Sequence, residues 1–215
     1  MEFIRQHKFI AIFRGVPEEQ LLPCAQAIYD GGVRLLEITF DPTDPATAEK
    51  IARQIETVRR EFGGEIVVGA GTTVRSEYVQ PAAEAGARFI VAPNTDKDVI
   101  RLTKAHGMLS MPGAFTPTEI VEAYQAGADV VKIFPIRPDD ISYLKVILPP
   151  LKHIPFMPTG GVNPQNAGEF IRLGAVAVAA GATVVLPDAL RRGDYAAIRE
   201  AARAHVEAVQ AVKAE

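Results

Sequence analysis

The sequence predicts an α/β fold built from about eight repeats of a short buried strand followed by a helix. Apolar runs of about five residues alternate along the chain with amphipathic segments of helical length, which is the pattern of βαβ units and a parallel sheet. Three helical segments end in a glycine step that leads into the next apolar run, at Glu84–Ala87, Gln125–Ala128 and Arg172–Ala175. Eight such units favour a single (β/α)8 TIM barrel, although the same periodicity also fits a doubly wound open sheet.

The expected strands are short runs of β-branched, aliphatic and aromatic residues, as in parallel sheets that are covered on both faces. Several of these runs stop at a proline or glycine, which indicates a turn. In chain order the runs are Phe9–Phe13, Val33–Phe40, Ile66–Gly69, Arg88–Ala92, Met108–Met111, Val130–Phe134, Ile154–Met157 and Ala175–Ala180.

The expected helices lie between these runs, and capping residues mark some of their starts. Thr116 precedes Pro117 and Glu119, and Asn163 precedes Pro164, as at helix N-termini. The helical segments are Glu18–Asp30, Pro45–Phe62, Ser76–Ala85, Asp96–Ala105, Thr116–Ala126, Asp139–Leu148, Pro164–Leu173 and Tyr195–Lys213.

Composition narrows the class of protein. The 215 residues are 48% hydrophobic and 23% charged, and no linker or shift in composition divides them, so we expect one barrel domain over residues 1–215. A net charge of −3 without basic blocks argues against a nucleic-acid or membrane partner. Met1–Lys8 lacks the apolar region of a signal peptide, and no run is long enough to span a membrane, which favours a cytoplasmic location. Cys24, the single cysteine, is expected to be a small buried residue in a helix.

Lys132 is the first charged residue that stands out, because it interrupts the apolar run Val130–Phe134. Burial disfavours the charged form of an amine and lowers its pKa, and a neutral amine can form a Schiff base with a ketone. The alternative is that Lys132 reaches solvent at the strand end or pairs with an acid.

Glu37 is the second, a carboxylate inside Leu35–Phe40. Strands two and six lie across a barrel from each other, so we expect the side chains of Glu37 and Lys132 to converge at its mouth. A carboxylate there can carry the protons that Schiff-base chemistry requires. The alternative is a buried salt bridge with only a structural role.

Glycines follow the last two strands, where barrels often bind phosphate. Gly160 and Gly161 precede a helix N-terminus, and Gly181 comes directly after the eighth expected strand. Glycines let backbone N–H groups approach an anion, and the helix dipole adds to the attraction.

A metal site or cofactor is not expected. His7, His106, His153 and His205 have no zinc-ligand spacing, and no strand end carries an acidic cluster that would bind magnesium. Each histidine is expected to lie at the surface or in an interface.

Six short motifs are spread in order over nearly the whole chain. They are Leu-Glu-Ile-Thr around Glu37, Val-Gly-Ala-Gly-Thr ending at Thr72, Val-Ala-Pro-Asn at Val91–Asn94, Met-Pro-Gly at Met111–Gly113, Val-Lys-Ile-Phe-Pro around Lys132 and Pro-Thr-Gly-Gly-Val at Pro158–Val162. Together they resemble the class I 2-keto-3-deoxy-6-phosphogluconate / 4-hydroxy-2-oxoglutarate aldolases. The segment Ala-Ile-Phe-Arg-Gly around Arg14 is similar to the corresponding segment of the related 2-keto-3-deoxy-6-phosphogalactonate aldolases.

The resemblance implies a metal-independent aldolase that cleaves a 2-keto-3-deoxy acid to pyruvate and an aldehyde such as glyceraldehyde 3-phosphate, without a cofactor. It implies Lys132 as the imine-forming residue, Glu37 as the general acid and base, and a homotrimer. The implied binding residues are Thr72, Pro93, Phe134 and Thr159 around the pyruvate half of the substrate, and Gly160, Gly161 and Gly181 around its phosphate.

Two positions depart from this family pattern. The phosphogluconate branch has Leu-Arg-Thr where this chain has Phe40-Asp41-Pro42, and Asp41 would repel a substrate carboxylate. Arg14 is the compensating cation that we expect to bind it. Many members have a phosphate-binding serine where this chain has Ala182, and the next hydroxyl, on Thr183, would point the other way along a strand.

The main hypothesis is therefore a lysine-dependent pyruvate aldolase. A second enzymatic hypothesis is another phosphate-binding barrel, such as an epimerase or a thiamine-phosphate-synthase-like enzyme, which would explain the glycines but not a lysine opposite a glutamate. A third is a catalytically silent barrel that acts as a binding module, because a fold alone does not establish activity.

Overall fold

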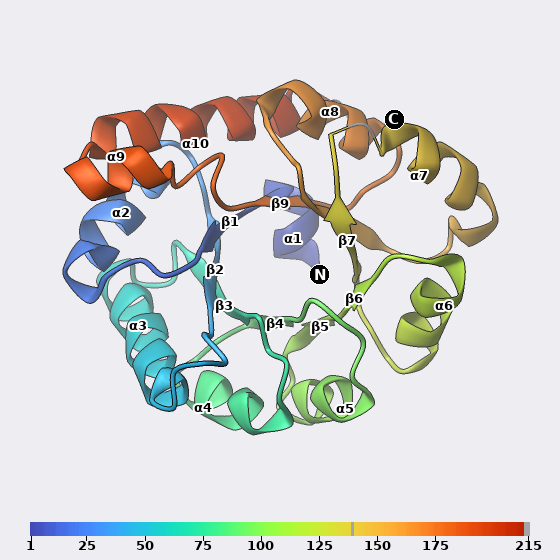
Figure 1. Ribbon diagram of the computed structural model, residues 1–215, viewed down its shortest axis with the longest axis horizontal. Coiled ribbons are helices and arrows are strands. Elements are labelled where there is room, and N and C mark those ends of the chain that lie inside the picture. Colours follow the sequence, from blue (N-terminus) through green and yellow to red (C-terminus); the bar gives the residue numbers. More distant parts are fainter. Residues whose placement is uncertain (139, 213–215) are drawn as a thin grey trace.

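The computed structural model describes residues 1–138 and 140–212, which form a ring of parallel strands surrounded by helices (Figure 1). This confirms the predicted (β/α)8 barrel rather than the open sheet. Neighbouring strands follow the order β5-β4-β3-β2-β1-β9-β8-β7-β6. The strands are β1 (Phe9–Phe13), β2 (Leu35–Thr39), β3 (Val67–Gly71), β4 (Phe89–Val91), β5 (Leu109–Met111), β6 (Gly113–Ala114), β7 (Val131–Ile136), β8 (Phe156–Gly160) and β9 (Val178–Ala180).

Nine strands occupy eight positions, because the fifth strand is split at Pro112. β5 pairs with β4 and β6 pairs with β7, so the chain itself closes the ring between Met111 and Gly113. Proline has no N–H to donate to a ladder, but the Pro112 carbonyl accepts a hydrogen bond from the Lys132 N–H at 2.8 Å. The sequence predicted only the part before the proline, Met108–Met111.

Helices cover the outside of the barrel, and their order agrees with the predicted alternation. Two of them, α1 and α9, were not predicted from the sequence. The expected helix at Ser76–Ala85 starts as the 3-10 turn η1 (Ser76–Tyr78), and a second such turn is η2 (Pro149–Leu151). Asp139 and Lys213, the terminal residues of two expected helices, lie outside the described residues. The helices are α1 (Glu2–His7), α2 (Glu18–Asp30), α3 (Thr47–Glu61), α4 (Val79–Glu84), α5 (Lys97–Ala105), α6 (Pro117–Gln125), α7 (Ile141–Ile147), α8 (Pro164–Arg172), α9 (Pro187–Arg192) and α10 (Tyr195–Gln210).

Apolar side chains fill two regions. The larger lies between the outer faces of the strands and the helices. The smaller fills the barrel interior, where Ile10, Leu35, Met111 and Met157 pack with Ile4 of α1. In Figure 1 α1 lies within the outline of the ring and on its far side. The helix therefore closes the end of the barrel at which the strands begin.

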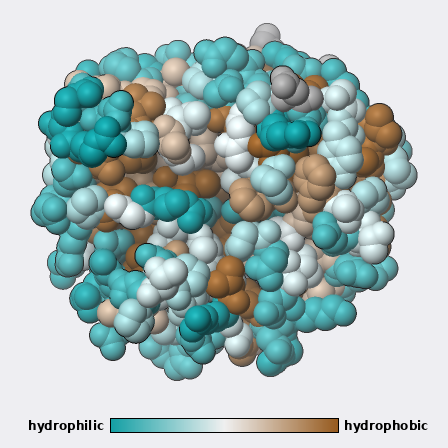
Figure 2. Space-filling model, in the orientation of Figure 1, coloured by the Kyte–Doolittle hydropathy of each residue, from teal (hydrophilic) through white to brown (hydrophobic). Residues whose placement is uncertain are grey.

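The face turned to the viewer is the end at which the strands stop, because α1 precedes β1 and lies behind it. Figure 2 shows this face with hydrophilic side chains along the rim and apolar surface between them toward the middle. Loops after parallel barrel strands carry the chemistry of this fold, so this face holds the candidate site. None of the described helices is long and apolar enough to cross a membrane.

Candidate active site

Lys132 points into the barrel from β7. Alternate residues of a strand share a face, and Val130 belongs to the interior cluster whereas Val131 and Ile133 pack outward against the helices. Lys132 is only 4% exposed, so the alternative in which its ammonium reaches solvent is wrong. Its Nζ lies 4.9 Å from the centroid of the Phe134 ring.

Glu37 points into the same interior from β2, two residues after the interior residue Leu35. It is fully buried, and neither carboxyl oxygen has a hydrogen-bond partner. No N···O contact within 4.0 Å joins Glu37 to Lys132 in the described chain, so the structure does not form the purely structural salt bridge. A buried polar group without a partner costs free energy, and such an arrangement is typical of a site that binds a ligand there.

Burial shifts the pKa of each group in the direction that favours its neutral form. It raises the pKa of Glu37, while the charges of Lys132 and Arg14 oppose that rise. It lowers the pKa of Lys132, the Glu37 charge opposes this, and Arg14 lowers it further. The site therefore favours an amine with a free lone pair next to a carboxyl group that holds a proton, which are the nucleophile and the general acid of imine formation.

The end of β3 is shaped around Glu37. A Cβ atom on Gly71 would stand 1.8 Å from the Glu37 Oε1 atom, so only glycine leaves room for the carboxyl group. Thr72, which follows, has a φ of +55°, a conformation that is uncommon outside glycine and that clusters at functional sites. Thr73 is fully buried, and its hydroxyl has no hydrogen-bond partner. Sequence analysis missed Thr73, although its place directly after a glycine-threonine motif could have indicated it.

Three more of the predicted binding residues each lie two positions after an inward-facing residue of the same strand, and therefore nearer the mouth of the barrel. Thr159 follows the interior residue Met157 by two positions, is 4% exposed and has an unpartnered hydroxyl. Pro93 follows the interior residue Val91 in the same way, and Phe134 follows Lys132. The structure thus brings Thr159, Pro93 and Phe134 to the same end of the barrel as Lys132 and Glu37.

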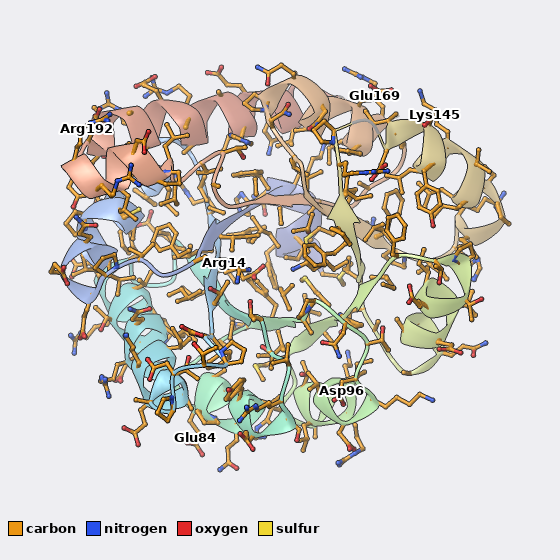
Figure 3. All side chains as sticks on the ribbon, in the orientation of Figure 1. Arg14, Glu84, Asp96, Lys145, Glu169 and Arg192 are labelled. Atoms are coloured by element: carbon orange, nitrogen blue, oxygen red, sulfur yellow. The ribbon has the colours of Figure 1, made fainter. Side chains whose placement is uncertain are left out.

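Arg14 lies in the turn after β1, and Figure 3 shows it near the centre of the ring. It is exposed, and it lines a cleft of about 720 Å³ together with Thr39, Asp41 and Gln54. Neither Lys132 nor Glu37 lines this cleft. Hydrogen bonds from the Thr43 hydroxyl and N–H lower the pKa of Asp41, so Asp41 keeps the negative charge that was expected to oppose a substrate carboxylate.

The glycine turns after β8 and β9 lie at the mouth, but their N–H groups differ in availability. Gly160 has a φ of +132°, which favours glycine. The Gly161 N–H already donates to the Ile136 carbonyl, so it is occupied in this state. The Gly181 carbonyl accepts from the N–H groups of Val184 and Val185, which makes residues 181–185 a tight turn.

Thr183 and His205 differ from the sequence-based expectations. Thr183 lies beyond the end of β9, and its hydroxyl turns inward to the Val162 carbonyl and to His205. His205 was expected at the surface or in an interface, which is wrong, because it is fully buried in α10. Its position in a helix with a buried face could have indicated this.

Cys24 is buried as predicted, and burial raises the pKa of its thiol to about 12. In the described residues, no three His, Cys, Asp or Glu side chains are grouped so that they could hold a metal ion.

The chain matches known proteins over nearly its whole length. A family model described as "KDPG and KHG aldolase" matches residues 1–201. A protein of Rhizobium meliloti (strain 1021), named "Probable 2-dehydro-3-deoxy-6-phosphogalactonate aldolase", is 32% identical over 210 residues, which are 96% of this chain and 93% of that protein.

Two solved structures are similar as well. The one titled "Native KDPGal structure" has a TM-score of 0.81 and 29% identity and covers 94% of both chains. The second, KDPG aldolase from Legionella pneumophila, is described "with pyruvate captured at low pH as a covalent carbinolamine intermediate". It has a TM-score of 0.79 and 25% identity, and the alignment covers 94% of this chain and 95% of that chain. A carbinolamine is the adduct of an amine and a ketone. Pyruvate in that structure is therefore bound covalently through an amine, and a buried neutral amine is suited to this reaction.

Proposed function

Because the chain belongs to the KDPG and KHG aldolase family, we propose that its Schiff base forms on Lys132 and that Glu37 moves the protons of the reaction. The chain is a class I aldolase that cleaves a 2-keto-3-deoxy acid to pyruvate and an aldehyde. The observation that carries the assignment of residues is the pair itself. Both side chains are buried, the two do not form an ion pair with each other, and burial favours the neutral form of each.

The reaction follows from these two groups. The neutral Lys132 amine attacks the C2 carbonyl of the keto acid, and its proton passes to the oxygen to give a carbinolamine. Glu37 donates a proton to the departing hydroxyl group, and water leaves as the imine forms. The carboxylate then takes the proton of the C4 hydroxyl as the C3–C4 bond breaks, so the aldehyde leaves and the bonding electrons move into an enamine. Protonation of C3 and addition of water release pyruvate and restore both groups.

We propose that Arg14 binds the substrate carboxylate, and that Thr72, Pro93, Phe134 and Thr159 enclose the pyruvate half. Support comes from the exposed guanidinium of Arg14 beside the mouth and from the unpartnered Thr159 hydroxyl. The phosphate end of the substrate lies at the turns of Gly160, Gly161 and Gly181 in this proposal. The Gly161 N–H donates to the Ile136 carbonyl. It would have to give up this hydrogen bond to bind the phosphate; otherwise the N–H groups of neighbouring residues bind it.

The substrate of this proposal is a 2-keto-3-deoxy-6-phospho sugar acid of the phosphogalactonate or phosphogluconate type, as named for the relatives. We place the reaction in the cytoplasm, because a phosphorylated acid carries charges that do not cross an apolar barrier unaided. The partners are the keto acid and further copies of this chain in a homotrimer, with no nucleic acid or membrane surface, in keeping with the net charge of −3.

The experiment that tests the assignment of residues is reductive trapping. The protein is incubated with pyruvate and borohydride in excess chelator and then mapped by peptide mass spectrometry. We expect a reduced pyruvate adduct on Lys132. Lys132→Met should remove both the adduct and turnover, whereas Lys145→Met, on the outer helix α7, should leave them intact.

An adduct on another lysine would contradict the assignment. Glu37→Gln keeps the size of the side chain but cannot donate an acidic proton. We expect it to slow turnover by about 10²-fold or more, the typical contribution of a general acid or base. Turnover of the Glu37→Gln variant at the normal rate would show that another group moves the protons.

A further inference from the structure

Thr183 joins the two glycine turns at the mouth of the barrel. Its Oγ1 donates to the Val162 carbonyl at 2.9 Å, and Val162 is the residue directly after Gly161. Thr183 itself belongs to the turn that begins at Gly181. One hydroxyl group therefore links the turn after β8 to the turn after β9.

The His205 ring contacts the same hydroxyl group. Its Nε2 lies 3.2 Å from the Thr183 Oγ1, and its Nδ1 lies 2.8 Å from the Ala201 carbonyl. A carbonyl only accepts, so Nδ1 carries the ring proton and Nε2 of the neutral ring can only accept; the single proton of the Thr183 hydroxyl is then shared between the Val162 carbonyl and Nε2. The ring also stacks on Phe9 of β1 with 5.0 Å between ring centroids, and burial lowers the pKa of His205. The ring is thus fixed in orientation from two sides.

The first turn is fixed independently of Thr183. Asn163 and Asn166 form a capping box at the start of α8, and the Asn166 Nδ2 donates to the Gly161 carbonyl at 2.9 Å. In the described residues, the side-chain hydrogen bonds of the turn at 181–185 are those of Thr183. Thr183 therefore supplies the side-chain link between the two turns, in addition to the pairing of β8 with β9 and the burial of Val184.

We propose that Thr183 and His205 are positioning residues that hold the two glycine turns at the spacing that binds the phosphorylated end of the substrate. This inference rests on the proposed function, because it takes the phosphate to lie between these turns. Ala182, which is exposed, offers no hydroxyl group to an anion. Backbone N–H groups must then supply most of the contacts, and their affinity depends on being correctly placed before the anion arrives.

The test compares two substrates and two probes in matched variants. Thr183→Val keeps the shape of the side chain and removes the hydroxyl group, and Thr183→Ser keeps the hydroxyl. The substrates are 2-keto-3-deoxy-6-phosphogalactonate and the unphosphorylated 4-hydroxy-2-oxoglutarate. The probes are inhibition by inorganic phosphate and the yield of the borohydride-reduced pyruvate adduct.

We expect Thr183→Val to raise the KM for the phosphorylated acid and the inhibition constant of phosphate about fivefold, the effect of losing one hydrogen bond. The kcat, the KM for 4-hydroxy-2-oxoglutarate and the adduct yield should change less than about twofold. Thr183→Ser should restore the affinity. His205→Gln, which can still reach Thr183, should bind phosphate better than His205→Asn, which can keep only the bond to Ala201.

Unchanged phosphate affinity in Thr183→Val would overturn the inference, and so would equal losses with both substrates, which would indicate a merely structural role. Failure of the proposed function looks different, because the unaltered protein would then give no pyruvate adduct on Lys132. If the adduct forms but inorganic phosphate does not inhibit the unaltered protein, the aldolase assignment stands and the inference fails.

Discussion

Arg14 acts on the pair of Lys132 and Glu37 by its charge as well as by any contact with substrate. A positive charge nearby disfavours a second positive charge, so Arg14 lowers the pKa of Lys132, and it favours the negative form, so it also lowers the pKa of Glu37. The same residue that we propose as carboxylate ligand therefore helps to keep the nucleophile unprotonated.

This predicts the pH dependence of an Arg14→Gln variant. Activity of the free enzyme requires the neutral amine, so kcat/KM falls as the pH drops through the pKa of Lys132. Removing the Arg14 charge raises that pKa, and the acid limb of the profile of kcat/KM against pH should move to higher pH. Arg14→Lys retains the charge and is the control, with a limb close to that of the unaltered protein. A limb that moves equally in both variants, or moves to lower pH, would contradict the charge effect.

A stability measurement tests the same lysine without any substrate. The folded-state pKa of Lys132 is lowered, so its contribution to stability is present above the unfolded value of about 10.4 and is lost as the pH falls toward the folded pKa. Lys132→Met should therefore be more stable than its parent at pH 7. The advantage should shrink as the pH rises to 10, by up to about 1.4 kcal/mol per pH unit within that window.

Urea unfolding monitored between pH 7 and pH 10 gives these free energies of unfolding. Both proteins should carry Glu37→Gln, so that titration of the neighbouring carboxyl does not enter the comparison. A Lys132→Met variant that is less stable at pH 7, with no pH trend, would mean that the lysine is stabilised in its charged form.

At this scale the sequence reveals residues that contrast with their neighbours. Lys132 and Glu37 are charged residues in apolar runs, and their convergence follows from strand order. His205 does not contrast with its neighbours in this way: it lies at helical spacing from the buried residues Ile198, Ala202 and Val209, but the sequence does not identify a partner for its polar ring. Its burial depends on two tertiary contacts, with Phe9 and Thr183.

Among the elements, β3 has the most direct effect on the site through Gly71. An alanine there would place its Cβ on the Glu37 carboxyl group, and the carboxyl would have to move. We expect Gly71→Ala to lower kcat by about tenfold or more, the order of loss that follows misplacement of a catalytic group. The adduct yield with pyruvate should fall as well, while the far-UV circular dichroism is retained.

Gly63→Ala is the matched control for this change. Gly63 lies in the turn after α3 with a φ of +56° and no atom within 4 Å of an added Cβ, so it tests backbone strain away from the site. Its turnover should equal that of the unaltered protein. Normal turnover of Gly71→Ala would show that Glu37 can shift without consequence, which would weaken its catalytic role.

The elements that the sequence did not predict have physical reasons in common. α1 and α9 span six residues each, too few to show a helical period. β6 has two residues and follows a proline, so local sequence signals alone place the end of the strand at Met111. The pairing of Gly113 with Lys132 is a contact between distant segments. The longer strands and helices, by contrast, carry enough periodicity to be predicted.

For the whole molecule, the ring of strands explains why residues far apart in sequence share one site. Glu37 and Lys132 are separated by four strand positions along the ring in one direction, and the two strands face each other across the interior. Closure at Met111–Gly113 fixes the two halves of the ring relative to each other. The distance between amine and carboxyl is therefore a property of the barrel and not of any one loop.

The homotrimer is the last prediction, and the apolar surface around α7 is where we expect the contact. Val146 is 75% exposed. An adjacent groove of about 270 Å³ has an apolar floor that includes Leu148, Phe156 and Leu173, and Lys145 and Lys152 also line it. Exposed apolar surface of this kind often marks a contact between proteins.

Sedimentation equilibrium should give three times the mass of one chain. Val146→Glu should shift the distribution toward the single chain, because it places a charge in the contact. Glu84→Lys also changes the surface charge, but Glu84 lies on α4 at the other side of the ring (Figure 3). This variant should leave the trimer intact. A trimer that persists in Val146→Glu would move the contact elsewhere, and a single-chain mass for the unaltered protein would rule out the homotrimer.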